Sequence, residues 1–237
     1  MTKQKSIWVF GDYRNYFQNR VTLQLLSKAV DLAGVIGAEV CAVVVGHNIE
    51  EWIMEYTAHG ADRILSIDHP SLTSYSTEHY LALMQQLVTQ RDPDIILIGA
   101  TDFGREFAPR LAKRLQTGLS ADCVGLDITP EGLLIQTAPS FGGNMLAEIV
   151  TEMHRPQMAT VRPRTFAIPA PNPDRRGRVT AMTEPKAETT SPSQASARAL
   201  ARVSAVAAPQ GLVCLMITAA GASWSSRTAS RAASPST

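Results

Sequence analysis

The stretch Ile95-Ile96-Leu97-Ile98-Gly99-Ala100-Thr101-Asp102-Phe103-Gly104-Arg105 decides the fold class, because it joins a strand pattern to the start of a helix pattern. The four consecutive branched side chains at 95–98 are typical of a strand that is covered on both faces. Phe107, Leu111 and Leu115 follow at helical spacing. The stretch therefore predicts a buried parallel strand, a tight turn and a helix in direct succession.

The same alternation continues toward the amino terminus. Short apolar runs of strand length occupy 7–10, 40–45 and 63–67. Helical patterns separate them over 23–33, 49–56 and 81–88. Continuous apolar strands that alternate with helices predict an α/β fold class with a parallel sheet covered on both faces.

Beyond Gly118 the pattern changes, because no segment of helical length lies between the strand-like runs. These runs are 121–128, 133–137, 145–150 and 158–161. We expect them to be antiparallel or mixed additions to the sheet.

Composition excludes several classes of protein. The 237 residues carry a net charge of +1, which argues against a strongly basic nucleic-acid binder. Three widely spaced cysteines, without a CxxC pair, predict reduced and mostly buried thiols in a cytoplasmic protein. The longest late apolar run, 211–222, is too short for a membrane-spanning helix.

The carboxyl-terminal part differs in composition from the rest. Of the 51 residues at 187–237, 14 are Ala, 10 are Ser and one is acidic. Such a segment cannot bury enough apolar surface to offset the entropy of ordering. We therefore divide the chain into a folded domain at 1–166, a Pro/Arg-rich linker at 167–186 and a disordered tail at 187–237.

The strongest candidate for a binding site is the helix start that follows the strand at 95–99. Ligands of open α/β sheets bind beyond the carboxyl ends of strands, and helix N-termini favour anions. Thr101, Gly104 and Arg105 are the candidate cofactor-binding residues, with Arg105 facing a phosphate. The alternative is ordinary capping, with Arg105 in a structural ion pair. Asp122 is expected to be buried and to need a hydrogen-bonding partner.

Three stretches together resemble the alpha subunit of electron-transfer flavoproteins. They are Gly99-Ala100-Thr101 through Ala108-Pro109-Arg110; Thr117-Gly118-Leu119-Ser120-Ala121-Asp122-Cys123; and Phe141-Gly142-Gly143-Asn144 with Arg155-Pro156-Gln157-Met158-Ala159-Thr160-Val161-Arg162-Pro163. The resemblance covers residues 5–166, the amino-terminal domain of that family. The opening Trp8-Val9-Phe10 with Gly11-Asp12-Tyr13 looks like the electron-bifurcating branch.

The resemblance implies a fold like the adenine-nucleotide alpha-hydrolase group, a beta-subunit partner, and electron delivery between an acyl-CoA-type or related dehydrogenase and another carrier. It also implies FAD in the intact heterodimer, with the redox chemistry belonging to the flavin rather than to an enzyme active site. Phe141–Asn144 and Arg155–Pro163 are expected to form an exposed loop and edge that serve the partner subunit.

The Gly-rich and Ser/Thr-rich flavin loops of that family do not occur in this sequence. We therefore expect a truncated or frameshifted chain, with 187–237 standing in place of the FAD domain. The competing interpretation is a stand-alone nucleotide-binding module of the same fold, with AMP or ATP near Thr101–Arg105.

Overall fold

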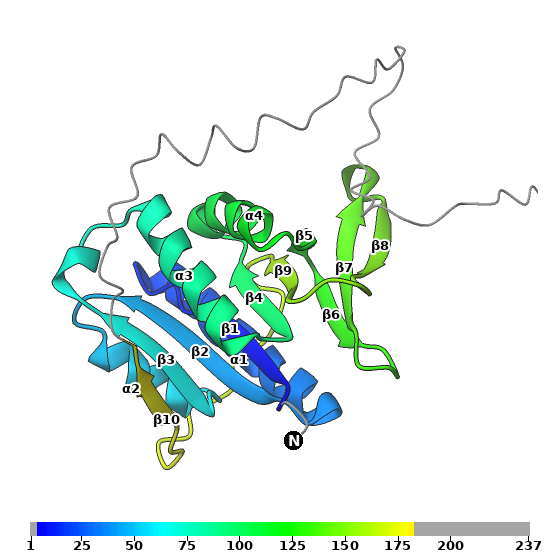
Figure 1. The fold of residues 1–237 in the computed structure, drawn as a ribbon. Helices are drawn as coiled ribbons and strands as arrows, with labels where there is room; N and C mark the ends of the chain where they lie inside the picture. Colours follow the sequence, from blue (N-terminus) through cyan, green and yellow to red (C-terminus); the bar gives the residue numbers. More distant parts are fainter. Residues whose placement is uncertain (1–3, 183–237) are drawn as a thin grey trace, which may run out of the picture. The chain divides into compact units, whose positions relative to one another are not determined.

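The structure, a computed structural model, describes residues 4–182 of the chain. The predicted tail at 187–237 and the third cysteine, Cys214, lie outside the described residues. The described part forms one unit, with two sheets and four α-helices (Figure 1).

The main sheet has seven strands in the order β10-β3-β2-β1-β4-β9-β5, and every neighbouring pair is parallel. Val9 lies in the centre, in register with Ala42 on one side and Leu97 on the other. The predicted α/β class with a parallel sheet is thereby confirmed. The strands are β1 Ser6–Phe10, β2 Glu39–Gly46, β3 Arg63–Asp68, β4 Ile95–Gly99, β5 Leu119–Cys123, β9 Gln157–Val161 and β10 Arg178–Ala181.

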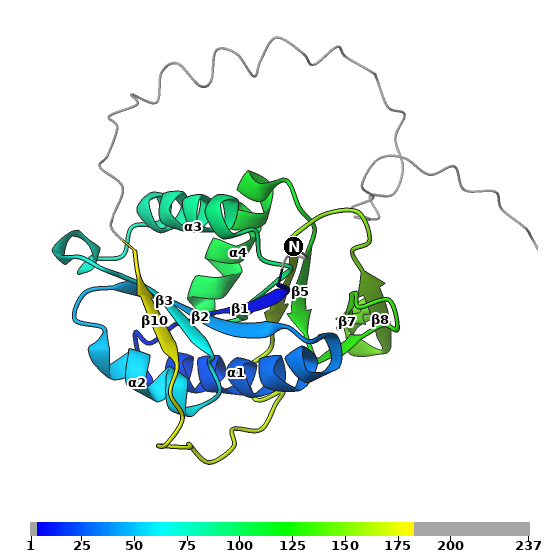
Figure 2. The same cartoon turned by 60° about the horizontal axis from the view of Figure 1, so that its bottom comes forward.

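Helices cover both faces of this sheet, as Figure 2 shows. Helices α1 (Tyr16–Ile36) and α2 (Glu50–Ala58) lie on one face, and α3 (Thr77–Arg91) and α4 (Asp102–Leu115) lie on the other. Because strand side chains alternate between faces, Ile7 and Val9 pack with α1, whereas Trp8 and Phe10 pack with α3 and α4. The continuous apolar runs follow from this two-sided burial. Short 3-10 turns occupy Pro70–Leu72 and Phe141–Gly143.

Helix ends follow local sequence signals. The Asn15 side chain caps α1 by accepting a hydrogen bond from the Gln18 N–H at 2.9 Å. Gly37 ends the same helix in the left-handed region, at φ 65°. Asp92 ends α3 at φ 48°, directly before Pro93. The positions of the two long helices are therefore set by residues visible in the sequence.

The carboxyl-terminal half divides its strands between two sheets. β6 (Gly125–Ile128), β7 (Leu134–Ser140) and β8 (Met145–Val150) form an antiparallel sheet, which confirms the predicted antiparallel additions. β5 and β9, however, are parallel members of the main sheet. The run at 121–128 is thus divided between two strands, because β5 ends at Cys123 and β6 begins at Gly125; Asp122, at φ 57°, marks an irregularity within β5.

The chain also contributes a strand beyond the sequence-based domain limit at residue 166. Residues 178–181, within the segment assigned to a linker, form β10 and pair with 63–66 of β3. Arg178 reaches Glu39, and Arg175 pairs with Asp62 at 2.6 Å. Ionic contacts therefore accompany backbone pairing at this edge.

Two of the three cysteines lie in the described part, and both are buried free thiols. Burial raises the pKa of Cys41 to about 12 and that of Cys123 to about 11. Both thiols are therefore protonated at neutral pH and poor nucleophiles.

Candidate functional site

The candidate site lies at the carboxyl edge of the main sheet, between the ends of β1 and β4. β1 leads to α1 on one face and β4 leads to α4 on the other, so the direction of winding changes between these neighbouring strands (Figures 1 and 2). Open α/β sheets bind ligands in the crevice at such a point. Asp12 enters it from the β1 side and Thr101 from the β4 side, and both are buried.

Thr101 caps α4 and links the two loops of the crevice. Its Oγ1 accepts a hydrogen bond from the Gly104 N–H at 3.2 Å. The same hydroxyl donates to Oδ2 of Asp12, also at 3.2 Å. Because a hydroxyl has one hydrogen to donate, this contact commits the Thr101 donor to the protein itself.

Asp12 is a buried carboxylate with several partners. Nε of Arg14 donates to Oδ1 at 2.8 Å, and the Asp12 N–H donates to Oγ1 of Thr22 at 2.9 Å. The Arg14 guanidinium in turn lies 3.5 Å from the centre of the Phe103 ring. A buried charge is stable only when it is paired and hydrogen-bonded, and the Asp12 carboxylate meets that requirement through Arg14 at Oδ1 and Thr101 at Oδ2.

Gly104 allows α4 to approach the end of β4. A Cβ atom at this position would lie 1.8 Å from the carbonyl oxygen of Gly99, which no side chain can do without a shift of backbone. The absence of a side chain is therefore explained by helix–strand packing.

Arg105 points to a different partner. Its Nη2 lies 3.4 Å from Oδ1 of Asp122, while Nη2 and Nε of Arg162 contact Oδ2 of Asp122 at 2.5 and 3.1 Å. The hydrogen bonds from Arg162, helped by the charges of both arginines, lower the pKa of Asp122 despite its partial burial. Asp122 is half-buried rather than buried, and the expected partner is this pair of arginines.

The structure brings Thr101 and Gly104 into one crevice and turns Arg105 toward Asp122. Sequence reasoning did not assign Asp12 and Arg14, which complete the crevice. The available signal was Gly11-Asp12-Tyr13-Arg14 directly after the first strand, where a phosphate-binding fold of this kind has a glycine-rich loop.

A second feature is a set of exposed apolar side chains on and just after the edge strand β8, here called the β8 surface; because side chains alternate along a strand, Met145 and Ile149 lie on one face and Leu146 and Val150 on the other. Its side chains are exposed although they are large and apolar, with Leu146 at 64% and Met153 at 85%. The β8 surface consists of Met145, Leu146, Ile149, Val150 and Met153. Exposed apolar patches of this kind mark interaction sites.

The segments expected to serve a partner subunit border this surface but differ from each other. Gly142, Gly143 and Asn144 are exposed directly before β8. Residues 157–161, by contrast, form the buried strand β9 between β4 and β5, so the expectation of an exposed edge is wrong there. The sequence does not distinguish the two cases. A run of five residues such as 157–161 has the length of a short edge strand, and the same length is enough for a strand that is buried between two neighbours.

Two further properties concern residues 4–182. No helix within this range is both long enough and apolar enough to cross a bilayer. Within the same residues, no group of three or more His, Cys, Asp or Glu side chains is placed to hold a metal ion.

The fold and the crevice define the class: an α/β domain with a seven-stranded parallel sheet covered by helices on both faces and a small antiparallel sheet attached. The family model "Electron transfer flavoprotein domain" matches residues 7–187. The chain belongs to the electron transfer flavoprotein family.

Curated relatives agree with this assignment. The chain is 47% identical over 163 residues to an electron transfer flavoprotein subunit alpha of Clostridium acetobutylicum, an alignment that covers 68% of this chain and 48% of the relative. It is 41% identical over 165 residues to the lactate dehydrogenase (NAD(+),ferredoxin) subunit LctC of Acetobacterium woodii, covering 70% and 40%. It is 36% identical over 182 residues to an acryloyl-CoA reductase electron transfer subunit beta of Anaerotignum propionicum, covering 67% and 50%. The chain spans about half the length of the curated relatives it matches.

Proposed function

We propose that this chain acts as an electron-transfer flavoprotein alpha subunit, pairing with a beta subunit to pass electrons between a flavin dehydrogenase and another carrier. In this role the chain is an electron carrier subunit rather than an enzyme, because the flavin supplies the redox chemistry. Family membership supports the role. The single observation that carries the docking part is the exposed β8 surface.

The β8 surface suits a subunit interface better than it suits solvent. Met145 and Leu146 are each more than half exposed, and Glu148 is the single charged residue of the strand. Interface cores are depleted in charge and enriched in Met and large apolar side chains. We propose that the beta subunit covers this surface, together with the adjoining turn at 141–144.

The cofactor contact at Thr101, Gly104 and Arg105 remains a prediction. Phosphate binding there is disfavoured because the Thr101 donor is committed to Asp12, and the Asp12 carboxylate lies in the same crevice. Gly104 and Arg105 have structural partners as well. We propose that these residues hold the fold together, and that the FAD of the intact heterodimer is bound outside residues 4–182.

The competing function is a stand-alone nucleotide-binding module with AMP or ATP near Thr101–Arg105. Equilibrium dialysis of the 237-residue chain with AMP, ATP and FAD separates the two functions. The subunit role predicts no tight binding of any of the three by the isolated chain. Stoichiometric binding of AMP, lost on substitution Arg105→Gln, would support the module instead.

The identity of the dehydrogenase is a further part of the proposal. Two of the relatives are named as subunits of different redox enzymes, an acryloyl-CoA reductase and a lactate dehydrogenase. We infer that the chain is cytoplasmic and that its redox partner is an acyl-CoA-type or related dehydrogenase. We also infer that the chain belongs to the electron-bifurcating branch of the family. Reduction of the assembled heterodimer by each candidate dehydrogenase, followed by flavin absorbance, tests the choice.

The docking role is tested by co-purification of this chain with an electron-transfer flavoprotein beta subunit. Leu146→Asp introduces a charge into the β8 surface and should abolish co-purification. Val35→Asp is the matched control, because Val35 is equally exposed but lies near the end of α1. Circular dichroism should be native for both variants. If Leu146→Asp folds and still co-purifies, the proposed interface is wrong.

A further inference from the structure

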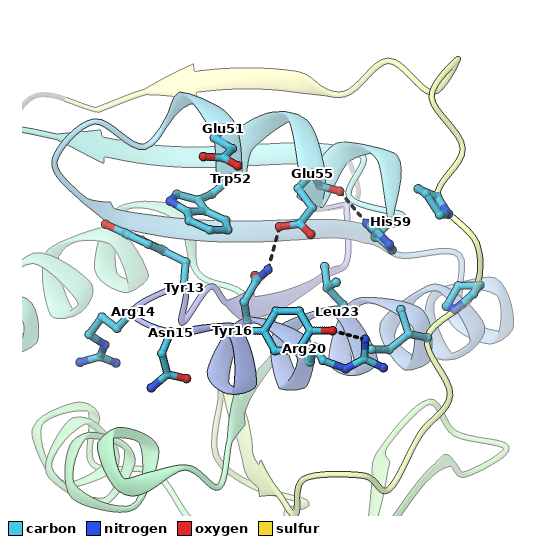
Figure 3. Close-up of a pocket in the computed structure, with 14 residues that line it drawn as sticks. Tyr13, Arg14, Asn15, Tyr16, Arg20, Leu23, Glu51, Trp52, Glu55 and His59 are labelled. Carbon is cyan, nitrogen blue, oxygen red and sulfur yellow. Dashed lines mark hydrogen bonds between the residues drawn. The ribbon is translucent and has the colours of Figure 1, made fainter.

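A pocket of about 870 Å³ lies on the α1/α2 face of the domain, away from the β8 surface. The pocket lies between the first turns of α1 and the helix α2. Residues 168–171 close one side of it (Figure 3). Pockets for small organic ligands fall within this range of volumes. The pocket has no role in the proposed subunit docking.

One wall of the pocket offers acceptors. Glu51 and Glu55 lie four residues apart in α2, and His59, four residues further on, is the C-cap residue, so the three follow one face of the helix into the pocket. The His59 Nδ1 lies 2.9 Å from the Glu55 carbonyl oxygen, which can only accept, so Nδ1 carries the hydrogen. In the neutral ring Nε2 is then an acceptor, like the two carboxylates.

The Glu55 carboxylate is held in position by a buried side chain of α1. The Asn19 amide donates to its Oε2 at 2.8 Å, and the buried Tyr56 hydroxyl donates to Oδ1 of Asn19 at 2.9 Å (Figure 3 shows the first contact). Asn19 is itself buried, so it fixes the carboxylate rather than following it. One carboxylate oxygen of Glu55 stays available to a ligand.

Aromatic rings form the adjoining surface. Trp52 stacks on Tyr13, with ring centres 5.3 Å apart and planes at 21°. Tyr16 also lines the pocket from α1, with its hydroxyl toward Arg20 (Figure 3). Indole and phenol faces attract cations, and the attraction adds to that of neighbouring carboxylates.

The arginines near the pocket do not neutralise these acids. Arg14 is paired with Asp12 and lies over Phe103 on the other side of the crevice. Arg20 donates to the Tyr16 hydroxyl at 3.1 Å and lies near the Tyr16 ring. Within residues 4–182, no cationic side chain forms an ion pair with Glu51 or Glu55.

We propose that this pocket binds an organic cation, an alkyl chain that ends in a guanidinium or ammonium group, with the charged end between Glu51 and Glu55 and the chain against Trp52. The acceptor wall matches the N–H donors of such a group, and Ile168, Pro169 and Pro171 provide apolar contact for the chain. The same chemistry is found in a free polyamine-type metabolite and in the Arg or Lys side chain of a partner protein.

Isothermal titration of the full-length chain tests the proposal with defined probes. The probes are agmatine, as a free small cation, and N-acetyl-arginine amide, as a protein side chain, with N-acetyl-citrulline amide as the neutral match. At least one of the two cations should bind, and the citrulline compound should not. Agmatine binding alone identifies a free metabolite as the natural class, and binding of the arginine amide alone identifies a protein side chain.

Variants connect binding to the pocket. Glu51→Gln combined with Glu55→Gln should weaken binding by about tenfold or more, because both charged acceptors of the cation are then removed. Glu50→Gln is the matched control, because it removes the same charge from the same helix outside the pocket lining, and it should change affinity by less than about twofold. Glu51→Gln alone serves if the double variant does not fold, because Glu51 is exposed. Absence of binding by both cations, or equal affinity in the Glu51 variants and the wild type, overturns the proposal.

Discussion

Gly104 is the residue on which the packing of α4 against β4 depends most directly. In an open helix position Gly→Ala stabilises a protein, but here the added Cβ would meet the Gly99 carbonyl oxygen at 1.8 Å. We expect Gly104→Ala to lower the free energy of unfolding by about 1–3 kcal/mol, the usual cost of overpacking, as measured by urea denaturation.

The matched control is Gly34→Ala. Gly34 is also helical, in α1, and a Cβ there would meet no atom within 4 Å. This variant should gain about 0.5–1 kcal/mol. If Gly104→Ala is as stable as Gly34→Ala, the packing explanation for Gly104 fails.

Asp122 predicts a pH dependence of stability. Its folded-state pKa is lower than its unfolded value of about 3.9, so its contribution is complete above that value and is lost as the pH falls through the folded pKa. Asp122→Asn keeps a residue type that tolerates the left-handed backbone but removes the charge. The stability difference between wild type and variant, from denaturation at pH 3 to 7, should shrink below about pH 4. A difference that stays constant over this range would contradict the assigned ion pair.

At the scale of single elements, the edge strand β10 depends on arginine contacts outside its backbone pairing. Arg175 donates to Asp62 at 2.6 Å and to the Gly60 carbonyl at 3.1 Å, which anchors the chain just before the strand. Arg175→Gln should accelerate amide hydrogen exchange at 178–182. Arg176→Gln is the control, because the Arg176 side chain donates, among residues 4–182, to the nearby Pro173 carbonyl alone. Equal exchange rates in the two variants would show that the anchor has no effect.

Elements with a local signal could be predicted from the sequence, and elements that depend on distant partners could not. β1, β2 and β4 are continuous apolar runs, and α1 ends at a glycine, so composition and spacing suffice. β10 has the sequence Arg-Val-Thr-Ala and is mostly exposed, so its pairing with β3 has no local signature. The placement of β9 between β4 and β5 likewise depends on pairing across about 60 and 40 residues of chain.

For the candidate site, too, residues with a local sequence signal could be predicted and residues brought together by the fold could not. Thr101 and Gly104 adjoin a strand end and a helix start, so a sequence window of ten residues identifies them. The pocket could not be found in this way, because its lining comes from α1, α2 and the separate segment at 168–171. Its acceptors at 51, 55 and 59 look like an ordinary solvated helix face until the fold places the start of α1, with Tyr13 and Tyr16, beside them.

At the scale of the whole molecule, the two sheets differ in how they are covered. The main sheet is covered by helices on both faces and contains the core. The antiparallel sheet leaves β8 exposed, which is unfavourable for an isolated chain and favourable for an interface. We therefore propose that subunit docking takes place on the small sheet and that the main sheet serves as the scaffold.

Amide hydrogen exchange of the full-length chain, with and without an electron-transfer flavoprotein beta subunit, tests this claim most directly. Added beta subunit should slow exchange at 145–153 and leave the last turn of α1, around Val35, unchanged. Unchanged exchange at 145–153 in a complex that has formed, or protection confined to the α1/α2 face, would contradict it.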